Sequence, residues 1–116
     1  MKRKVFNQIY MAALEESDHD RFIAEWGSSS LVLPDPDTDV DFDKITNDLD
    51  MAWNIAHMPP RELISKSGLS QYAFSRRYCI KKRTLDHWIS GQNQMPPHTR
   101  YMIAELLGLI EVEDDA

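Results

Sequence analysis

The sequence predicts an all-α protein of seven short helices, because its apolar residues recur at helical spacing. Residues 4–15 show the pattern most clearly, with Phe6, Ile9 and Ala13 on one stripe. Serine, aspartate or proline stands before most of the predicted helices, and glycine follows most of them, as expected for helix caps. The apolar run 31–33 is too short to predict a sheet.

Residues 1–58 are predicted to form a helical extension with an acidic surface. Its three helices are expected over about residues 4–15, 18–26 and 43–57. Ser17 or Asp18 would cap the second helix, and Gly27 would end it. A linker rich in proline and aspartate, near residues 28–42, precedes the third helix.

The linker carries an acid at every second position from Asp35 to Asp43, so we considered calcium binding. An EF-hand loop starting at Asp35 would need a glycine at Val40 and a carboxylate at Thr46, and both are missing. Later starting frames lack the glycine as well. The four histidines and the single cysteine also lack metal-ligand spacing. We therefore expect no metal and no cofactor, and a linker whose last acids cap the next helix.

Residues 69–91 predict two short helices joined by a tight turn. Ser70 can cap the first helix, and Cys79 and Ile80 form the turn. The second helix runs over about residues 81–90 and stops at a glycine. Its inward face is expected to hold Leu85, Trp88 and Ile89. A short helix with an anchored back and a basic outer face suits the DNA major groove.

Two further helices complete this half of the chain. The first is expected over residues 61–67, opened by Pro60 and closed by Gly68. The last is expected over residues 98–107, followed by Gly108. The acidic tail, residues 111–116, is expected to be frayed. The predicted organisation is thus an extension over 1–58, a compact domain over 59–110 and a tail.

One set of residues has a spacing that extends across all four helices of this domain. Its members are Leu69-Ser70-Gln71, Phe74, Ile80, Arg83-Thr84-Leu85, Trp88, Gly91, Pro96-Pro97 and residues 103–108. With this spacing, residues 61–108 resemble the helix-turn-helix domain of lambda-repressor-like regulators of the Cro or Xre type. Cys79 departs from that pattern, because the family usually has a glycine in the turn. A non-glycine residue with positive φ costs on the order of 1 kcal/mol.

The resemblance implies binding to double-stranded DNA, with the helix over residues 81–90 in the major groove. The candidate DNA-binding residues are Gln71, Arg76, Arg77, Lys81, Lys82, Arg83, Thr84, Asp86, His87 and Ser90. Lys82 and Arg83 are candidates for base contacts, since a basic side chain can contact guanine O6 and N7. The alternative for Arg83 is a structural ion pair with Asp86.

The remaining candidates are assigned to the phosphate backbone or stay open. Gln71 is expected to bond a phosphate, as the resemblance implies, and Thr84 and Ser90 are further candidates for phosphate contacts. Sequence-independent phosphate contacts are expected from Arg76, Arg77 and Lys81, and from Arg100 in the last helix. For His87, a base contact, a phosphate contact and no contact at all remain open.

Charge is distributed unevenly along the chain, and this bears on its partners. The formal net charge of −6 argues at first against nucleic acid. However, residues 1–60 hold 5 Lys/Arg and 12 Asp/Glu, whereas residues 61–110 hold 8 Lys/Arg and 3 Asp/Glu. Local phosphate contacts drive association with DNA. The charge of the basic half, and not the net charge of the whole chain, therefore indicates whether the chain can bind nucleic acid.

Other classes of protein find little support in the sequence. No glycine-rich phosphate loop or nucleophile motif is present, so we do not expect an enzyme. No stretch approaches the roughly 20 apolar residues of a membrane span. The single cysteine excludes an internal disulfide framework and suits a reducing cytoplasm. We expect a cytoplasmic, nucleoid-associated protein.

The leading hypothesis is a dimeric, sequence-specific transcriptional regulator of prokaryotic or phage type, such as a repressor. An alternative is an antitoxin-like interaction module, whose acidic N-terminal helices bind a basic protein partner while the helix-turn-helix serves autoregulation. A third hypothesis is that the acidic half folds back on the basic helix and inhibits DNA binding.

Overall fold

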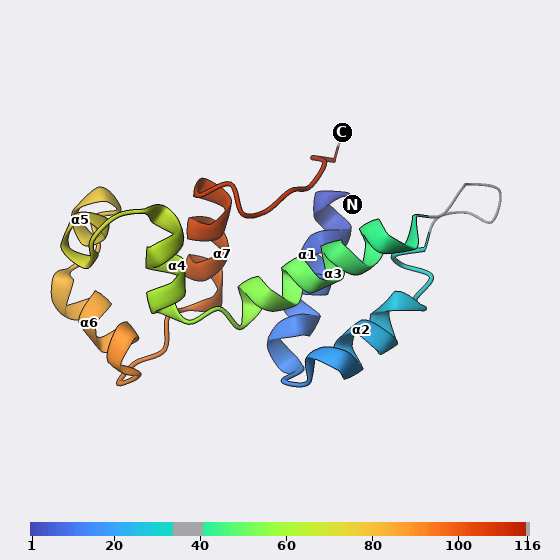
Figure 1. The fold of residues 1–116 in the computed structure, drawn as a ribbon, viewed down its shortest axis with the longest axis horizontal. Coiled ribbons are helices and arrows are strands. Elements are labelled where there is room, and N and C mark those ends of the chain that lie inside the picture. Colours follow the sequence, from blue (N-terminus) through green and yellow to red (C-terminus); the bar gives the residue numbers. More distant parts are fainter. Residues whose placement is uncertain (34–40, 116) are drawn as a thin grey trace. The chain divides into compact units, whose positions relative to one another are not determined.

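The computed structural model describes residues 1–33 and 41–115, and every regular element in these ranges is an α-helix. The helices are α1 (Arg3–Glu15), α2 (His19–Gly27), α3 (Phe42–Ala56), α4 (Pro60–Ser67), α5 (Gln71–Arg77), α6 (Lys82–Ser90) and α7 (Pro97–Leu106) (Figure 1). The predicted all-α class is confirmed, and the helix ends lie close to the predicted ones. The acidic stretch tested for calcium lies mostly in residues 34–40, outside the described residues.

The chain forms two compact units, each with its own core. Unit 1 comprises Met1–His57 together with Ile110–Ala116, and unit 2 comprises Met58–Leu109. The chain therefore leaves unit 1 once, forms unit 2 and returns.

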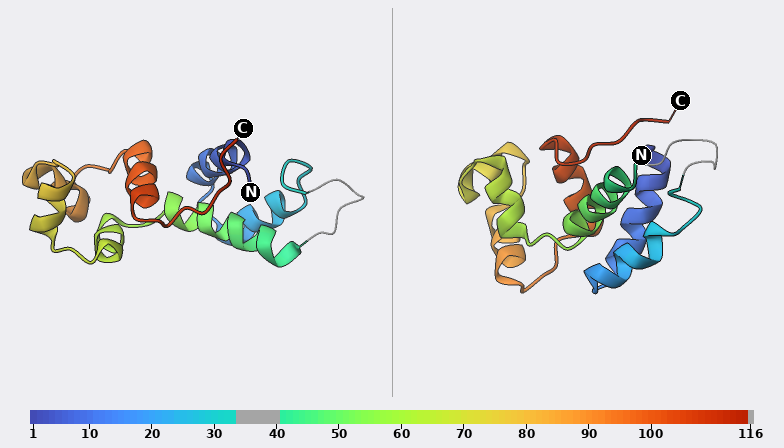
Figure 2. Two further views of the ribbon diagram at one scale, coloured as in Figure 1. Left: turned by 90° about the horizontal axis from the view of Figure 1, so that it is seen from above. Right: turned by 45° about the vertical axis from the view of Figure 1, so that its right-hand side comes forward.

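In unit 1, α1 and α2 both pack against α3 (Figures 1 and 2). The buried apolar side chains are Phe6, Ile9, Tyr10 and Ala13 of α1, Phe22 of α2, and Leu49, Ala52, Ile55 and Ala56 of α3. They recur at helical spacing in α1 and α3, which is why the sequence pattern identified these helices.

Side-chain caps fix where α2 and α3 begin. The Asp18 carboxylate accepts a hydrogen bond from the backbone N–H of Arg21 at 3.1 Å, so Asp18 is the cap and not Ser17. The Asp41 carboxylate accepts from the N–H of Lys44 at 3.0 Å, which confirms that the last acid of the linker caps α3. Each cap satisfies an amide that has no partner within its helix.

The end of α2 differs from the prediction. Gly27 is the last residue of the helix and does not adopt the left-handed conformation of a terminating glycine. Instead, the Ser28 hydroxyl donates to the carbonyl oxygens of Ala24 and Glu25, at 3.5 and 3.4 Å. A side chain therefore satisfies the last carbonyls, and the glycine conformation is not needed.

Trp53 of α3 and His57, the residue that follows α3, cap the C-terminal end of α1. The Trp53 indole N–H donates to the carbonyl oxygen of Glu16 at 2.9 Å, and His57 Nε2 lies 2.6 Å from the carbonyl oxygen of Ala13. A carbonyl oxygen only accepts, so Nε2 of His57 carries a proton. These bonds fix the contact between α1 and α3, and they account for the half-buried state of Trp53.

His19 joins α2 to α3 through an ion pair. Its Nε2 contacts the Asp50 carboxylate, and its Nδ1 lies 3.2 Å from the carboxylate of Asp20. The ring also packs edge-on against Trp53, with the centroids 4.9 Å apart. The hydrogen bond to Asp50, followed by that to Asp20, raises the pKa of His19 above its ordinary value of 6.5.

This arrangement predicts a pH-dependent contribution to the stability of unit 1. The folded pKa is above the unfolded one, so the contribution is complete below about pH 6.5 and is lost as the pH rises through the folded pKa. An NMR titration of the His19 ring should give a pKa above 6.5. The stability difference between the natural chain and His19→Gln should shrink as the pH rises above about 6.5. A titration midpoint at or below the ordinary value would contradict the ion pair.

The acidic tail is not frayed, contrary to expectation. The backbone of Glu113 forms hydrogen bonds with Met1 and Arg3, at 3.0 and 2.8 Å. The carboxylates of Glu113 and Asp114 pair with Lys2 and Arg3, respectively. The hydrogen bond from Lys2 lowers the pKa of Glu113. The tail and the start of α1 therefore lie side by side (Figure 2).

In unit 2, α4 packs against α5, α6 and α7, and α5 also packs against α6. The buried apolar side chains are Met58, Leu63, Ile64, Phe74, Leu85, Met95, Ile103 and Ala104. Each helix contributes to this core. Ser70 caps α5 as predicted, because its hydroxyl accepts from the N–H of Ala73 at 3.1 Å.

The turn between α5 and α6 contains the only non-glycine residue with positive φ among the described residues. Cys79 has φ = 56°, in the left-handed region. The N–H of Ile80 donates to the carbonyl of Ser75 at 2.8 Å across the turn. The turn thus keeps its left-handed geometry without a glycine, at a cost in backbone strain.

We predict that Cys79→Gly stabilises unit 2 by roughly 0.5–1 kcal/mol. The substitution removes left-handed strain of about 1–2 kcal/mol but adds freedom to the unfolded chain. Cys79 is exposed, so little packing is lost. In urea unfolding, the control Cys79→Ser should have nearly the same stability as the natural chain. Gly91→Ala should be destabilised, because Gly91 has φ = 83°. A loss of stability in Cys79→Gly would contradict the argument.

Candidate nucleic-acid interface

Helix α6 is anchored to unit 2 by one side and exposes the other. Leu85 is fully buried, whereas Trp88 and Ile89 are only half-buried, so the predicted inward face is narrower than expected. Helix α6 is at the edge of its four-helix unit. Trp88 and Ile89, about one turn beyond the buried Leu85, are therefore only partly covered. Arg83 and Asp86 lie on the exposed side.

Three basic side chains around the turn are exposed and unpaired. Arg77 ends α5, Lys81 precedes α6, and Arg83 lies in its first turn. None of the three forms an ion pair or side-chain hydrogen bond with any residue that the structure describes. Their charges are therefore available to a partner. The predicted alternative for Arg83, an ion pair with Asp86, is wrong.

Asp86 pairs with Lys82 instead. Lys82 Nζ contacts the Asp86 carboxylate one helical turn away, and the two side chains are 41% and 52% exposed. The i,i+4 spacing places both groups on adjacent turns of one face. A donor and an acceptor thus stand side by side on the surface of α6.

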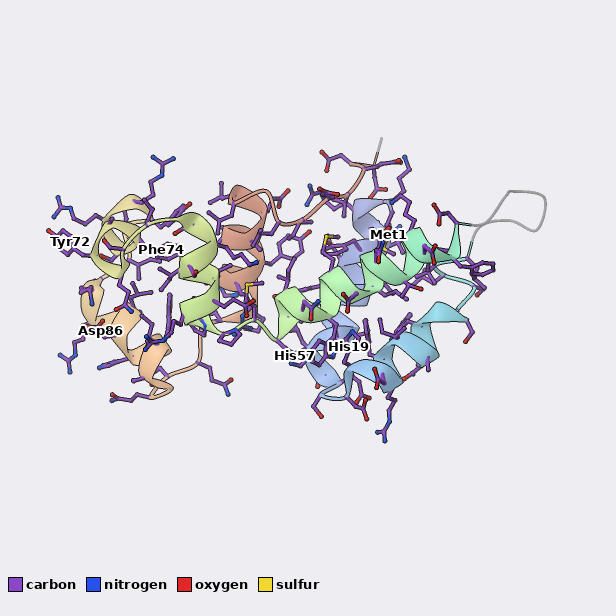
Figure 3. All side chains as sticks on the ribbon, in the orientation of Figure 1. Met1, His19, His57, Tyr72, Phe74 and Asp86 are labelled. Carbon is purple, nitrogen blue, oxygen red and sulfur yellow. The ribbon has the colours of Figure 1, made fainter. Side chains whose placement is uncertain are left out.

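Tyr72 and Arg76 form a second pair, on α5. The Arg76 guanidinium lies 5.7 Å from the centroid of the Tyr72 ring and donates a hydrogen bond to its hydroxyl at 3.2 Å. Figure 3 shows Tyr72 and Asp86 on the same side of unit 2, whereas Phe74 points inward. Sequence reasoning missed Tyr72, although its i,i+4 spacing from an arginine was a usable signal.

His87 and Ser90 are used by the end of α6 itself. The Ser90 hydroxyl donates to the carbonyl of His87 at 3.2 Å and accepts from the N–H of Gln92 at 3.4 Å. The His87 ring contacts the side chain of Asn93 at 3.5 Å. Both side chains therefore stabilise the turn after α6, and a phosphate contact would have to compete with these bonds.

The two remaining candidates are partly covered. Gln71 is the first residue of α5, and Thr84 lies in the first turn of α6; both are half-buried. The ten candidates therefore fall on α5, the turn and α6, two helices that pack against each other.

No group of three or more His, Cys, Asp or Glu side chains within residues 1–33 and 41–115 could hold a metal ion. None of the helices in those ranges is long and apolar enough to cross a bilayer.

Comparisons with known proteins give no relative. No protein-family model, curated protein or solved structure matches this chain.

Proposed function

We propose that the chain is a sequence-specific, double-stranded-DNA-binding transcriptional regulator of prokaryotic or phage type. Unit 2 would be a helix-turn-helix domain of the lambda-repressor-like class, as the sequence resemblance implies. The observation that carries the proposal is α6, which buries Leu85 and exposes Arg83 and Asp86 on its other side. A helix with its side chains is about 10–12 Å wide, and the major groove is about 12 Å wide.

The charge of the exposed surface supports this proposal. Arg77, Lys81 and Arg83 are unpaired among the described residues and lie on or beside the turn that leads into α6. Phosphate contacts would satisfy the charges of Arg77 and Lys81 and release counterions, which favours binding at low salt. In the proposed complex, Lys82 and Arg83 contact bases, and Arg76, Arg77 and Lys81 contact phosphates.

A regulator of this kind is proposed to act as a homodimer. One recognition helix covers a half-site of roughly 4–6 base pairs, so two copies at one-turn spacing provide the required specificity. The site selected by the chain should then be palindromic.

Selection of bound DNA from a random duplex pool tests the proposal, with the full chain at two salt concentrations. We expect a palindromic motif, which the double variant Lys82→Ala/Arg83→Ala loses. The matched control Lys4→Ala/Arg21→Ala also removes one lysine and one arginine, but from exposed positions of unit 1, and should still select the motif. Salt-sensitive binding without an enriched motif would show that the chain associates with DNA non-specifically and does not recognise a sequence. No binding at either salt would overturn the proposal.

A second candidate function is an antitoxin-like interaction module, favoured by the acidic surface of unit 1. Asp20, Glu25 and Asp43 are exposed there, and Phe42 and Met11 are both 63% exposed. An acidic surface with exposed apolar side chains suits a basic protein partner. Co-purification of a small basic protein with the natural chain from its own host would support this function, and isolation of the chain alone would oppose it.

A further inference from the structure

The acidic side chain on the exposed face of α6 has no obvious place on a surface that binds phosphates. Asp86 is the only acidic residue between Glu62 and Glu105, and it stands three residues after the unpaired Arg83. A carboxylate repels phosphate groups and accepts hydrogen bonds only from donors. Lys82 contacts one oxygen of this carboxylate. If α6 lies in the major groove, the other oxygen needs a donor on a base edge.

The contact with Lys82 narrows the choice of base pair. Lys82 Nζ and the Asp86 carboxylate are in direct contact, so a donor and an acceptor lie within hydrogen-bonding distance of each other. In a G·C pair, guanine O6 is an acceptor and cytosine N4 is a donor, and they are hydrogen-bonded to each other at a similar separation. The two arrangements are complementary atom for atom.

We infer that Lys82 and Asp86 together recognise one G·C base pair in each half-site; this inference rests on the proposed function. The lysine ammonium donates to O6 and N7 of guanine, and the aspartate accepts from N4 of the paired cytosine. The ion pair has no net charge, so it contributes specificity more than general affinity for DNA.

The other base pairs fit this donor–acceptor pair less well. A T·A pair also presents an acceptor beside a donor, namely thymine O4 and adenine N6. However, thymine has a methyl group where guanine has N7, so the ammonium loses one of its two acceptors. When either pair is reversed, the carboxylate faces a carbonyl oxygen and the ammonium faces an amino group, unless the side chains exchange places.

An i,i+4 Lys–Asp pair also stabilises a helix without any partner, and this purely structural role has to be separated from base recognition. Substitution of Asp86 separates them because the two roles predict different results. A structural pair affects folding or overall affinity, whereas a base contact affects one position of the selected site.

The test is selection from a random duplex pool with the full chain, Asp86→Asn, Asp86→Ala and the control Glu62→Gln. The control removes the same charge from unit 2 at an exposed position in the first turn of α4. The natural chain should select a G·C pair at one position of each half-site, by about tenfold over other pairs. Asp86→Asn should shift that position toward adenine, which asparagine contacts through N6 and N7. Asp86→Ala should abolish the preference there, and Glu62→Gln should leave the motif unchanged.

Failures of the inference and of the proposed function give different results. An unchanged motif in both Asp86 variants overturns the inference while sequence-specific binding stands. Equal weakening at all positions, with the helical circular dichroism unchanged, also overturns it, because Asp86 would then only position Lys82. If the natural chain enriches no motif, the proposed function fails first and the inference fails with it.

Discussion

Arg83→Ala should weaken binding to the selected duplex by about 2 kcal/mol, or roughly 30-fold, while the fold is unchanged. In the proposed complex this arginine makes a bidentate contact with guanine, and alanine leaves the O6 and N7 acceptors without donors. The side chain is exposed and has no partner among the described residues, so its removal should change stability by less than about 0.5 kcal/mol. Fluorescence anisotropy with selected and scrambled duplexes measures the effect.

Two control variants separate a base contact from charge. Arg83→Lys keeps the positive charge but loses the planar fork, so it should recover non-specific binding more fully than specific binding. Arg77→Ala should weaken binding to all duplexes alike and reduce the salt slope by about 1. If Arg83→Ala weakens selected and scrambled duplexes equally, Arg83 contacts only phosphate.

Phe74→Ala should destabilise unit 2 by about 3–5 kcal/mol, which is a large part of the total stability of a small domain. Phe74 is fully buried, and its ring lies 4.9 Å from that of Tyr78, so the smaller side chain leaves a cavity at the start of the turn. We expect loss of dispersed NMR resonances from unit 2 at moderate temperature, together with loss of DNA binding.

Phe42→Ala is the control for this prediction. Phe42 is 63% exposed on α3, so its truncation removes little buried area and should be nearly neutral. A similar small effect of Phe74→Ala in urea unfolding would show that the core of unit 2 is less tightly packed than the structure indicates.

The helices were predictable because their signals are local. Asp18, Asp41 and Ser70 satisfy amides within three residues of themselves, and such caps can be recognised in the sequence. The turn at Cys79 was also expected to be unusual, since a cysteine stands where a glycine is common in the family that the domain resembles.

What the sequence did not reveal depends on contacts between distant residues or on side-chain conformation. The His19–Asp50 pair and the capping of α1 by Trp53 join residues more than thirty positions apart. The partner of Asp86 is Lys82 and not Arg83, a choice between i−4 and i−3 that side-chain conformation decides. The candidate residues could be identified from their spacing in the sequence. The local hydrogen bonds that they form could not be predicted in this way.

The pairing of the tail with the start of α1 has a consequence for the order of events during synthesis. Residues 113–115 leave the ribosome after all of unit 2, yet they form the bonds that fix the first turn of α1. Unit 1 therefore acquires its last contacts only after the whole of unit 2 has been synthesised. A folded unit 2 also shortens the flexible loop that the tail has to close, which lowers the entropy cost of that final step.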